Sequence, residues 1–298
     1  MRIFMCLYSE KWSCRNMKLS FVLDSASDYR IEPITGYPLV IVPLNVQFGE
    51  DQYLDGVNIT ENEFYERMGR EPELPKTSQP SPHAFLETFK TEIDKGQVVI
   101  YLGLSKNLSG TLQSATLAKS MLDEADQNKI FIVDTGIASG GVHVLYERAV
   151  QLAAEGKNPE EICSVLNGEK KDITAYVLLE TLENLKKGGR ISAVQGAIAG
   201  MLNIKPLISI HDGVVETIGK FRGRKKGITK LNEMIQEWRQ NNPEKKLFII
   251  HSLNSKEEVL QEFNTSLNLD TFKNISFTRF GSTIGTYSGN NAIGFIYY

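Results

Sequence analysis

The chain has 298 residues, of which 41% are hydrophobic and 23% charged, and its formal net charge at pH 7 is -3. This balance is typical of a globular protein and gives no overall reason to expect a nucleic-acid partner. No apolar run approaches the roughly 18 to 20 residues that a membrane-spanning helix requires, so we expect at most a transient membrane contact. The length favours two domains.

The first 16 residues precede a second methionine, Met17, and contain Cys6 and Cys14. They lack the long apolar core of a secretory signal, and we interpret residues 1–16 as a disordered extension or as the result of a mis-chosen start codon. The third cysteine is Cys163, and no pair has the spacing of a zinc site or a redox motif. This usage predicts a cytoplasmic protein.

From residue 17 to residue 167, apolar runs that suit strands alternate with segments of helical periodicity. The predicted strands cover residues 18–24, 37–48, 97–104 and 129–134, and the predicted helices cover residues 81–96, 109–125 and 138–156. Such alternation predicts an α/β domain with a parallel sheet and helices on both faces.

Residues 168–298 show a different pattern, which predicts an α+β domain with a mixed sheet. Residues 206–221 form two alternating runs around Asp212-Gly213, as in a β-hairpin. A helix is expected over 228–241, and further strands over 247–253, 275–281 and 292–298.

Small polar residues follow three of the predicted parallel strands, at 24–28, 103–105 and 134–136. Carboxyl ends of parallel strands share one rim of the sheet, where ligands of α/β proteins bind. Turn formation and helix capping explain the same residue types, so each segment alone is a weak indication.

Residues 98–115 read VVIYLGLSKNLSGTLQSA, an apolar strand that turns into a helix beside Ser109 and Thr111. The N–H groups of a first helical turn attract an anion, and the hydroxyls add donors. Thr77 lies in a predicted loop before a helix that Ser81 caps and Pro82 starts, which leaves Thr77 free to face a ligand. A capping role for Ser109 and an exposed position for Thr77 are the alternatives.

Several segments together resemble the DegV family of bacterial fatty-acid-binding proteins, and they cover nearly everything after Met17 in the family's order. They read VLDSASD, KTSQPSP, GLSKNLSGTLQSA, VDTGIASGG, LENLKKGGRIS, IKPLISIHDG and GSTIGTYSGNNAIG.

The resemblance implies a non-catalytic carrier that holds one long-chain fatty acid between two domains, without a metal or cofactor. Thr77 and Ser109 would bind its carboxylate, helped by Thr286 or Tyr287. The turn residues Asp24, Ser25 and Ser27, together with Arg190, would lie behind the site or at its rim. The family further implies a separate fatty-acid kinase, which forms an acyl-phosphate for phospholipid synthesis.

One segment departs from the family, which commonly shows Gly-Thr-His-x-Gly-Pro-Gly where this chain reads GTYSGNN at 285–291. Tyr287 can donate a hydrogen bond but cannot become cationic. We therefore expect carboxylate binding to depend less on a titrating partner.

Apolar segments at 39–46 and 197–202 supply material for a tunnel, although ordinary core packing explains them too. Basic residues cluster at 186–190 and 220–226. A charge run is usually a solvated surface, but a dense patch in an acidic chain can steer an acidic partner. We predict that Arg222, Arg224 and Lys225 dock the kinase.

The main alternative is a serine hydrolase that acts on an acyl substrate through Ser109. Its turn does not read G-x-S-x-G, and no recognisable triad context surrounds the four histidines, which are His83, His143, His211 and His251.

A nucleotide-binding domain would need a phosphate-binding glycine motif, and neither of the two common ones follows a strand. A metal site would have to combine Asp24, Asp28 and Asp134 at the rim.

Overall fold

The computed structural model describes residues 18–298 apart from 31–32, 35, 192–202 and 264–273. The predicted extension 1–16 and the predicted tunnel segment 197–202 lie outside the described residues. The strands are β1 (Lys18–Asp24), β2 (Leu39–Val42), β3 (Asn45–Phe48), β4 (Asp51–Leu54), β5 (Lys76–Ser78), β6 (Gln97–Gly103), β7 (Ile130–Asp134), β8 (Thr174–Leu178), β9 (Ile204–His211), β10 (Val214–Arg222), β11 (Leu247–His251), β12 (Ile275–Arg279) and β13 (Ile293–Tyr297). The α-helices are α1 (Glu61–Arg70), α2 (Pro82–Asp94), α3 (Thr111–Ser120), α4 (Glu124–Gln127), α5 (Gly140–Ala154), α6 (Pro159–Glu169), α7 (Glu183–Lys187), α8 (Arg224–Asn241), α9 (Lys256–Phe263) and α10 (Ser282–Ser288), and the short 3-10 helices are η1 (Ser25–Ser27) and η2 (Lys170–Asp172).

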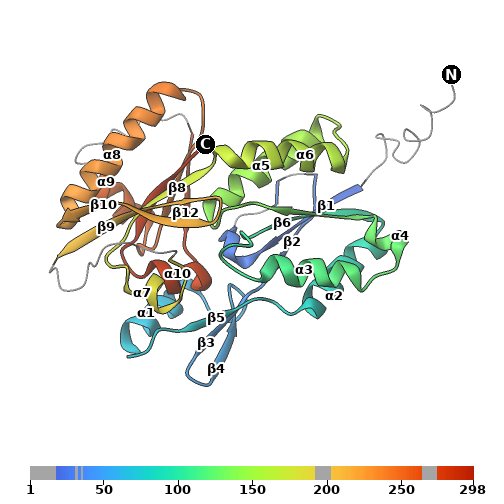
Figure 1. Cartoon of the computed structure of the whole chain (residues 1–298), viewed down its shortest axis with the longest axis horizontal. Helices are drawn as coiled ribbons and strands as arrows, with labels where there is room; N and C mark the ends of the chain where they lie inside the picture. Colours follow the sequence, from blue (N-terminus) through green and yellow to red (C-terminus); the bar gives the residue numbers. More distant parts are fainter. Residues whose placement is uncertain (1–17, 31–32, 35, 192–202, 264–273) are drawn as a thin grey trace.

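The first half of the chain contains the predicted parallel sheet, with strand order β2-β1-β6-β7. Helices α2 and α3 cover one face, and α5 and α6 cover the other (Figure 1). Successive strand residues point to opposite faces. Val22 therefore packs in the cluster of α2 and α3, while Phe21 and Leu23 pack in the cluster of α5. Burial on both faces explains the continuous apolar run of β1.

The predicted strand over 37–48 is wrong, because the chain there forms two strands in different sheets. Pro43 has no N–H for a ladder, and the N–H of Leu44 donates to Ser25 Oγ at 2.9 Å. The chain then enters β3, the centre of a small antiparallel sheet of order β4-β3-β5 that the sequence did not predict.

The second half contains a mixed sheet of order β10-β9-β8-β13-β11-β12, in which β11 and β12 pair in parallel and the other neighbours antiparallel. The hairpin of β9 and β10 is confirmed, and its turn residues Asp212 and Gly213 have φ of 46° and 70°. Helix α8 begins at Arg224, four residues before the predicted start.

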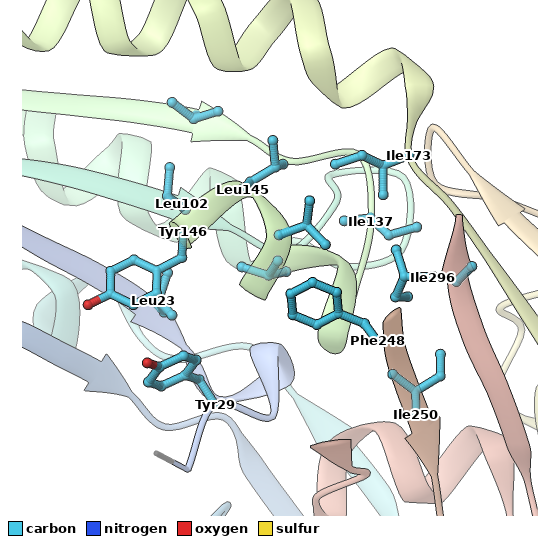
Figure 2. Packing of buried hydrophobic residues seen from close by; sticks show 14 of the residues in the cluster. Leu23, Tyr29, Leu102, Ile137, Leu145, Tyr146, Ile173, Phe248, Ile250 and Ile296 are labelled. Carbon is cyan, nitrogen blue, oxygen red and sulfur yellow. The ribbon is translucent and has the colours of Figure 1, made fainter. Parts of the chain in front are cut away.

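The two sheets share one apolar core, which confirms the predicted α/β fold with a parallel and a mixed sheet. Figure 2 shows Leu145 and Tyr146 of α5 in the same cluster as Leu23 of β1 and Phe248 of β11. Between β7 of the first sheet and β8 of the second, the chain forms α5 and α6. The predicted domain boundary at 167/168 lies within α6. That boundary stays a prediction. Among the described residues, no helix has the length and apolar character needed to cross a bilayer.

The bond between Ser25 and Leu44 predicts a stability difference. Replacing Ser25 by alanine leaves the buried N–H of Leu44 without its acceptor, so the free energy of unfolding should fall by about 1–3 kcal/mol in urea titrations. Ser20 is a matched control, because it is equally buried and its hydroxyl has no partner among the described residues. Ser20→Ala should leave the free energy of unfolding almost unchanged, and equal losses in both variants would contradict this account.

Candidate functional site

A cavity of about 460 Å³ lies between the two halves of the chain. Its volume is within the range of small-molecule sites, roughly 300–1,000 Å³. Most of its walls are apolar, and both halves contribute: the apolar lining residues are Leu44, Leu104, Leu108, Ala138, Ala175, Val177, Leu179, Leu185, Ile208, Ile210, Val215, Ile250, Phe280 and Ile284. On β8, Ala175 and Val177 face the cavity because Tyr176 and Leu178 point to the opposite face, under α8.

Four polar residues that line this cavity, Thr77, Ser109, Arg190 and Tyr287, are called the polar cluster. Tyr287 contacts both Thr77 and Arg190. Thr77 lies on β5, not in the predicted loop, and pairs with Val46 of β3. Its hydroxyl is 2.5 Å from the phenol oxygen of Tyr287 on α10. This hydrogen bond joins the small sheet of the first half to a helix of the second.

Ser109 lines the same cavity from the turn before α3, where the side chain of Gln79, which follows β5, packs on Gly110. Gly110 makes this possible, since a Cβ there would overlap Gln79 Oε1. The alternative role of Ser109 as the N-cap does not hold, because Gly110 is the N-cap and α3 begins at Thr111. The Ser109 hydroxyl does accept from the N–H of Thr111 at 3.3 Å. The hydroxyls of Ser109 and Thr111 are 2.9 Å apart.

Arg190 is the only charged residue among the described residues that line the cavity. Its Nη1 donates to the carbonyl of Gly188 at 2.6 Å, and its Nε donates to the carbonyl of Leu108 at 3.3 Å. The guanidinium carbon lies 5.3 Å from the centre of the Tyr287 ring, a cation–π distance. The cluster thus combines one positive charge with three hydroxyls, and these groups suit a carboxylate.

Thr286, predicted as a carboxylate ligand, does not line the cavity. It is fully buried and donates to the carbonyl of Ser282 at 2.8 Å within its own helix. The face of α10 that lines the cavity carries residues at helical spacing, which are Thr283, Ile284, Tyr287 and Ser288. The sequence analysis did not predict Thr283 as a cavity residue. Thr283 lies four residues before Tyr287, and this spacing places the two side chains on one face of a helix.

The turn residues Asp24, Ser25 and Ser27 are buried and do not line the cavity. Asp24 Oδ2 accepts from the N–H of Leu104 and from the hydroxyl of Tyr101, each at 2.8 Å. The hydroxyl of Ser25 accepts a hydrogen bond from the N–H of Leu44. Two cavity-lining leucines are therefore fixed by turn residues behind them, while Ser27 accepts from the N–H of Tyr29.

Known proteins share this architecture. A family model described as an uncharacterised protein of the DegV family matches residues 18–298. A DegV domain-containing protein of Caldanaerobacter subterraneus subsp. tengcongensis is 34% identical over 282 residues, which are 93% of this chain and 97% of that protein. The chain belongs to the DegV family.

Solved structures of DegV proteins have the same fold. A fatty-acid-binding DegV family protein from Thermus thermophilus has a TM-score of 0.81 and 29% identity, and the match covers 95% of this chain and 99% of that chain. A stearic-acid-binding protein from Eubacterium ventriosum has a TM-score of 0.80 and 28% identity, with 93% and 97% covered.

We predicted that Arg222, Arg224 and Lys225 dock the kinase. In the structure the surroundings of Arg224 differ from those of the other two residues. Arg222 and Lys225 are exposed. Arg224 is held by Glu262 at 2.8 Å, by Glu180 at 3.1 Å and by the carbonyl of Asn291 at 2.6 Å. Arg224 therefore stabilises the fold around the start of α8, and a charge change there tests folding as well as docking.

The cavity offers no base to Ser109, which the hydrolase alternative requires. None of the four histidines lines the cavity, and all four lie in the described part of the chain. His143 is buried against Thr278, and burial lowers its pKa to about 3. His211 bonds Thr174, and His83 lies exposed on α2.

Asp24, Asp28 and Asp134, the residues that a metal site at the rim would have to combine, are not grouped as metal ligands in the described part of the chain. No group of three or more His, Cys, Asp or Glu side chains suited to a metal ion occurs among the described residues. Asp24 and Asp28 instead accept backbone N–H groups.

Burial of Asp24 predicts a pH effect on stability. Burial raises its pKa from 3.8 to about 6, although bonds from Leu104, Tyr101 and Ala26 partly oppose the shift. The folded state therefore prefers the protonated acid, and this contribution to stability is full below about pH 4 and lost as the pH rises through 6. From pH 4 to pH 7, the free energy of unfolding of Asp24→Asn should rise relative to that of the wild type by about 2 kcal/mol. Urea titrations measure this change.

Asp94 provides the control, because it lies exposed on α2. The difference between Asp94→Asn and wild type should change by less than about 0.5 kcal/mol over the same range. A constant difference for Asp24→Asn would contradict the raised pKa.

Proposed function

We propose that this protein binds one long-chain fatty acid, with the acyl chain in the cavity and the carboxylate at the polar cluster. The observation that carries the proposal is the lining itself, in which Arg190 is the only charge among the described residues. A ligand with one negative end and a long apolar body complements this lining. Fatty-acid binding by DegV proteins of the same fold supports the assignment.

The expected energies favour a lipid over a small polar acid. Each buried methylene contributes about 0.8 kcal/mol, so a long acyl chain offers on the order of 10 kcal/mol before ordering costs. Each charge-assisted hydrogen bond to the carboxylate adds roughly 1.5–3 kcal/mol. The tail therefore supplies most of the affinity, and the polar cluster fixes the orientation.

We further infer a carrier role, in which a separate fatty-acid kinase receives the bound lipid and makes an acyl-phosphate for phospholipid synthesis. Ser109 lies in the cavity without a histidine base, which favours a carrier over a hydrolase. The exposed cations Arg222 and Lys225 suit an acidic kinase surface. The predicted cytoplasmic location agrees with this role and stays a prediction.

The polar cluster can be tested by removing its hydroxyls. The double variant Thr77→Val with Ser109→Ala should lose the lipid that copurifies with the wild type, as measured by native mass spectrometry and lipid extraction. In titrations its dissociation constant for palmitate should rise at least about tenfold, because the carboxylate loses two donors.

Thr116→Val is the control, since Thr116 lies exposed on α3 and bonds only the carbonyl of Leu112 in its own helix. It should bind palmitate like the wild type. Full lipid retention by the double variant, with unchanged folding, would remove Thr77 and Ser109 from the site. Absence of any acyl compound from the wild type, together with no palmitate binding, would overturn the proposed function.

Kinase docking can be tested without disturbing the fold. The variant Arg222→Glu with Lys225→Glu should keep its palmitate affinity and lose at least about tenfold in acyl-phosphate formation with the kinase, because the steering charge is reversed. Lys90→Glu on α2 is the control, as an exposed cation in the other half. Equal activity of both variants would place the docking surface elsewhere.

A further inference from the structure

Helix α10 carries cavity residues but does not cap its own first turn. It has seven residues and starts after Gly281, which has no side chain to accept the free N–H groups. A helix end of this kind needs acceptors from elsewhere when it is buried. Gly281, Ser282 and Thr283 are all buried, so water cannot serve.

The acceptors come from two aspartates of the first half of the chain. Asp28 Oδ1 accepts from the N–H of Gly281 at 2.9 Å. Asp55 Oδ1 accepts from the N–H of Ser282 at 3.0 Å, and its Oδ2 lies 3.3 Å from the N–H of Thr283. Both carboxyl groups are at most 3% exposed, and burial raises the pKa of Asp28 well above its usual range. Asp55, which pairs with Arg30, is the residue whose negative charge favours the positive end of the helix.

The surrounding residues hold this arrangement in place. Arg30 Nη2 lies 3.2 Å from Asp55 Oδ1 and its Nε lies 3.4 Å from Glu61, so the guanidinium joins Asp55 to α1. Tyr65 of α1 donates to the carbonyl of Phe280 at 3.1 Å, directly before Gly281. The approach to Gly281 is tight, because a Cβ there would lie 3.0 Å from Asp28 and Arg30, and these side chains would have to shift slightly.

We propose that Asp28 and Asp55 are positioning residues for the lipid head group, since they fix α10 so that Tyr287 faces Thr77 and Arg190. This inference rests on the proposed function, because it concerns the same site. The two aspartates are called the α10 clasp. The clasp touches residues 281–283, whereas Tyr287 follows on the same helix and lies in the cavity. Without the clasp, ligand binding would have to order α10, and that cost lowers affinity.

The test combines Asp55→Asn with Tyr287→Phe in a double-mutant cycle for palmitate binding. The introduced amide keeps one acceptor but turns an N–H group toward a helix N–H, so α10 loses a bond. Asp55→Asn should raise the dissociation constant about tenfold when made in the wild type, and less than about threefold when made in the Tyr287→Phe variant. A loss of equal factor in both backgrounds, or no loss at all, overturns the positioning role.

Hydrogen exchange gives a second readout that does not depend on the lipid. Amides of residues 282–288 should exchange about tenfold or more faster in Asp55→Asn, while those of β11 should not change. Unchanged exchange in α10 overturns the clasp even if the wild type binds palmitate. Accelerated exchange together with a wild type that binds no palmitate supports the clasp and overturns only the proposed function.

Two further variants serve as a control and as a replacement. Asp51→Asn is the matched control on the neighbouring strand β4, where the carboxylate is exposed and pairs with Arg67, and it should change neither affinity nor exchange. If Asp55→Asn does not fold, Asp28→Asn replaces it, because Asp28 holds a single N–H of the same turn.

Discussion

The guanidinium of Arg190 lies against a largely apolar cavity, where a charge without partners is costly. Two backbone carbonyls and the face of the Tyr287 ring reduce that cost without a carboxylate. The positive charge therefore remains uncompensated by any acidic residue among those that line the cavity. This imbalance selects an anionic ligand, and the apolar walls select one with a long hydrocarbon body.

The site depends on contacts between segments far apart in the chain. Thr77 comes from a small sheet, Ser109 from the turn after β6, and Tyr287 from α10, and each is held by neighbours that lie behind it. Gln79 packs on Gly110, and Asp55 accepts from the first turn of α10. The precision of the polar cluster thus comes from the residues around it, as in other sites built on rigid elements.

Local patterns in the sequence predicted the parallel sheet, the hairpin and the capping of α2 by Ser81, because each follows from a few neighbouring residues. The family resemblance pointed to Thr77, Ser109 and Tyr287, which all line the cavity, and it also gave Thr286, which does not. Whether a helical residue faces a cavity depends on the packing of the helix, and a motif alone does not specify it. Similarly, the split at Pro43 depends on a bond between Leu44 and the distant Ser25. The sequence around Arg224 is basic and therefore suggested an exposed docking surface. The acidic partners of Arg224 are distant in the sequence, so the local pattern could not reveal its ion pairs.

The walls of the cavity come from both halves, as Leu44 and Val177 illustrate. Anything that fills this space therefore touches both sheets, and its binding free energy adds to the free energy of unfolding through mass action. If the proposed fatty acid fills the cavity, folding and ligand binding are thermodynamically linked, and resistance to heat and proteases should rise with the supply of lipid. Lack of lipid would then shorten the lifetime of the protein itself and match its amount to the supply.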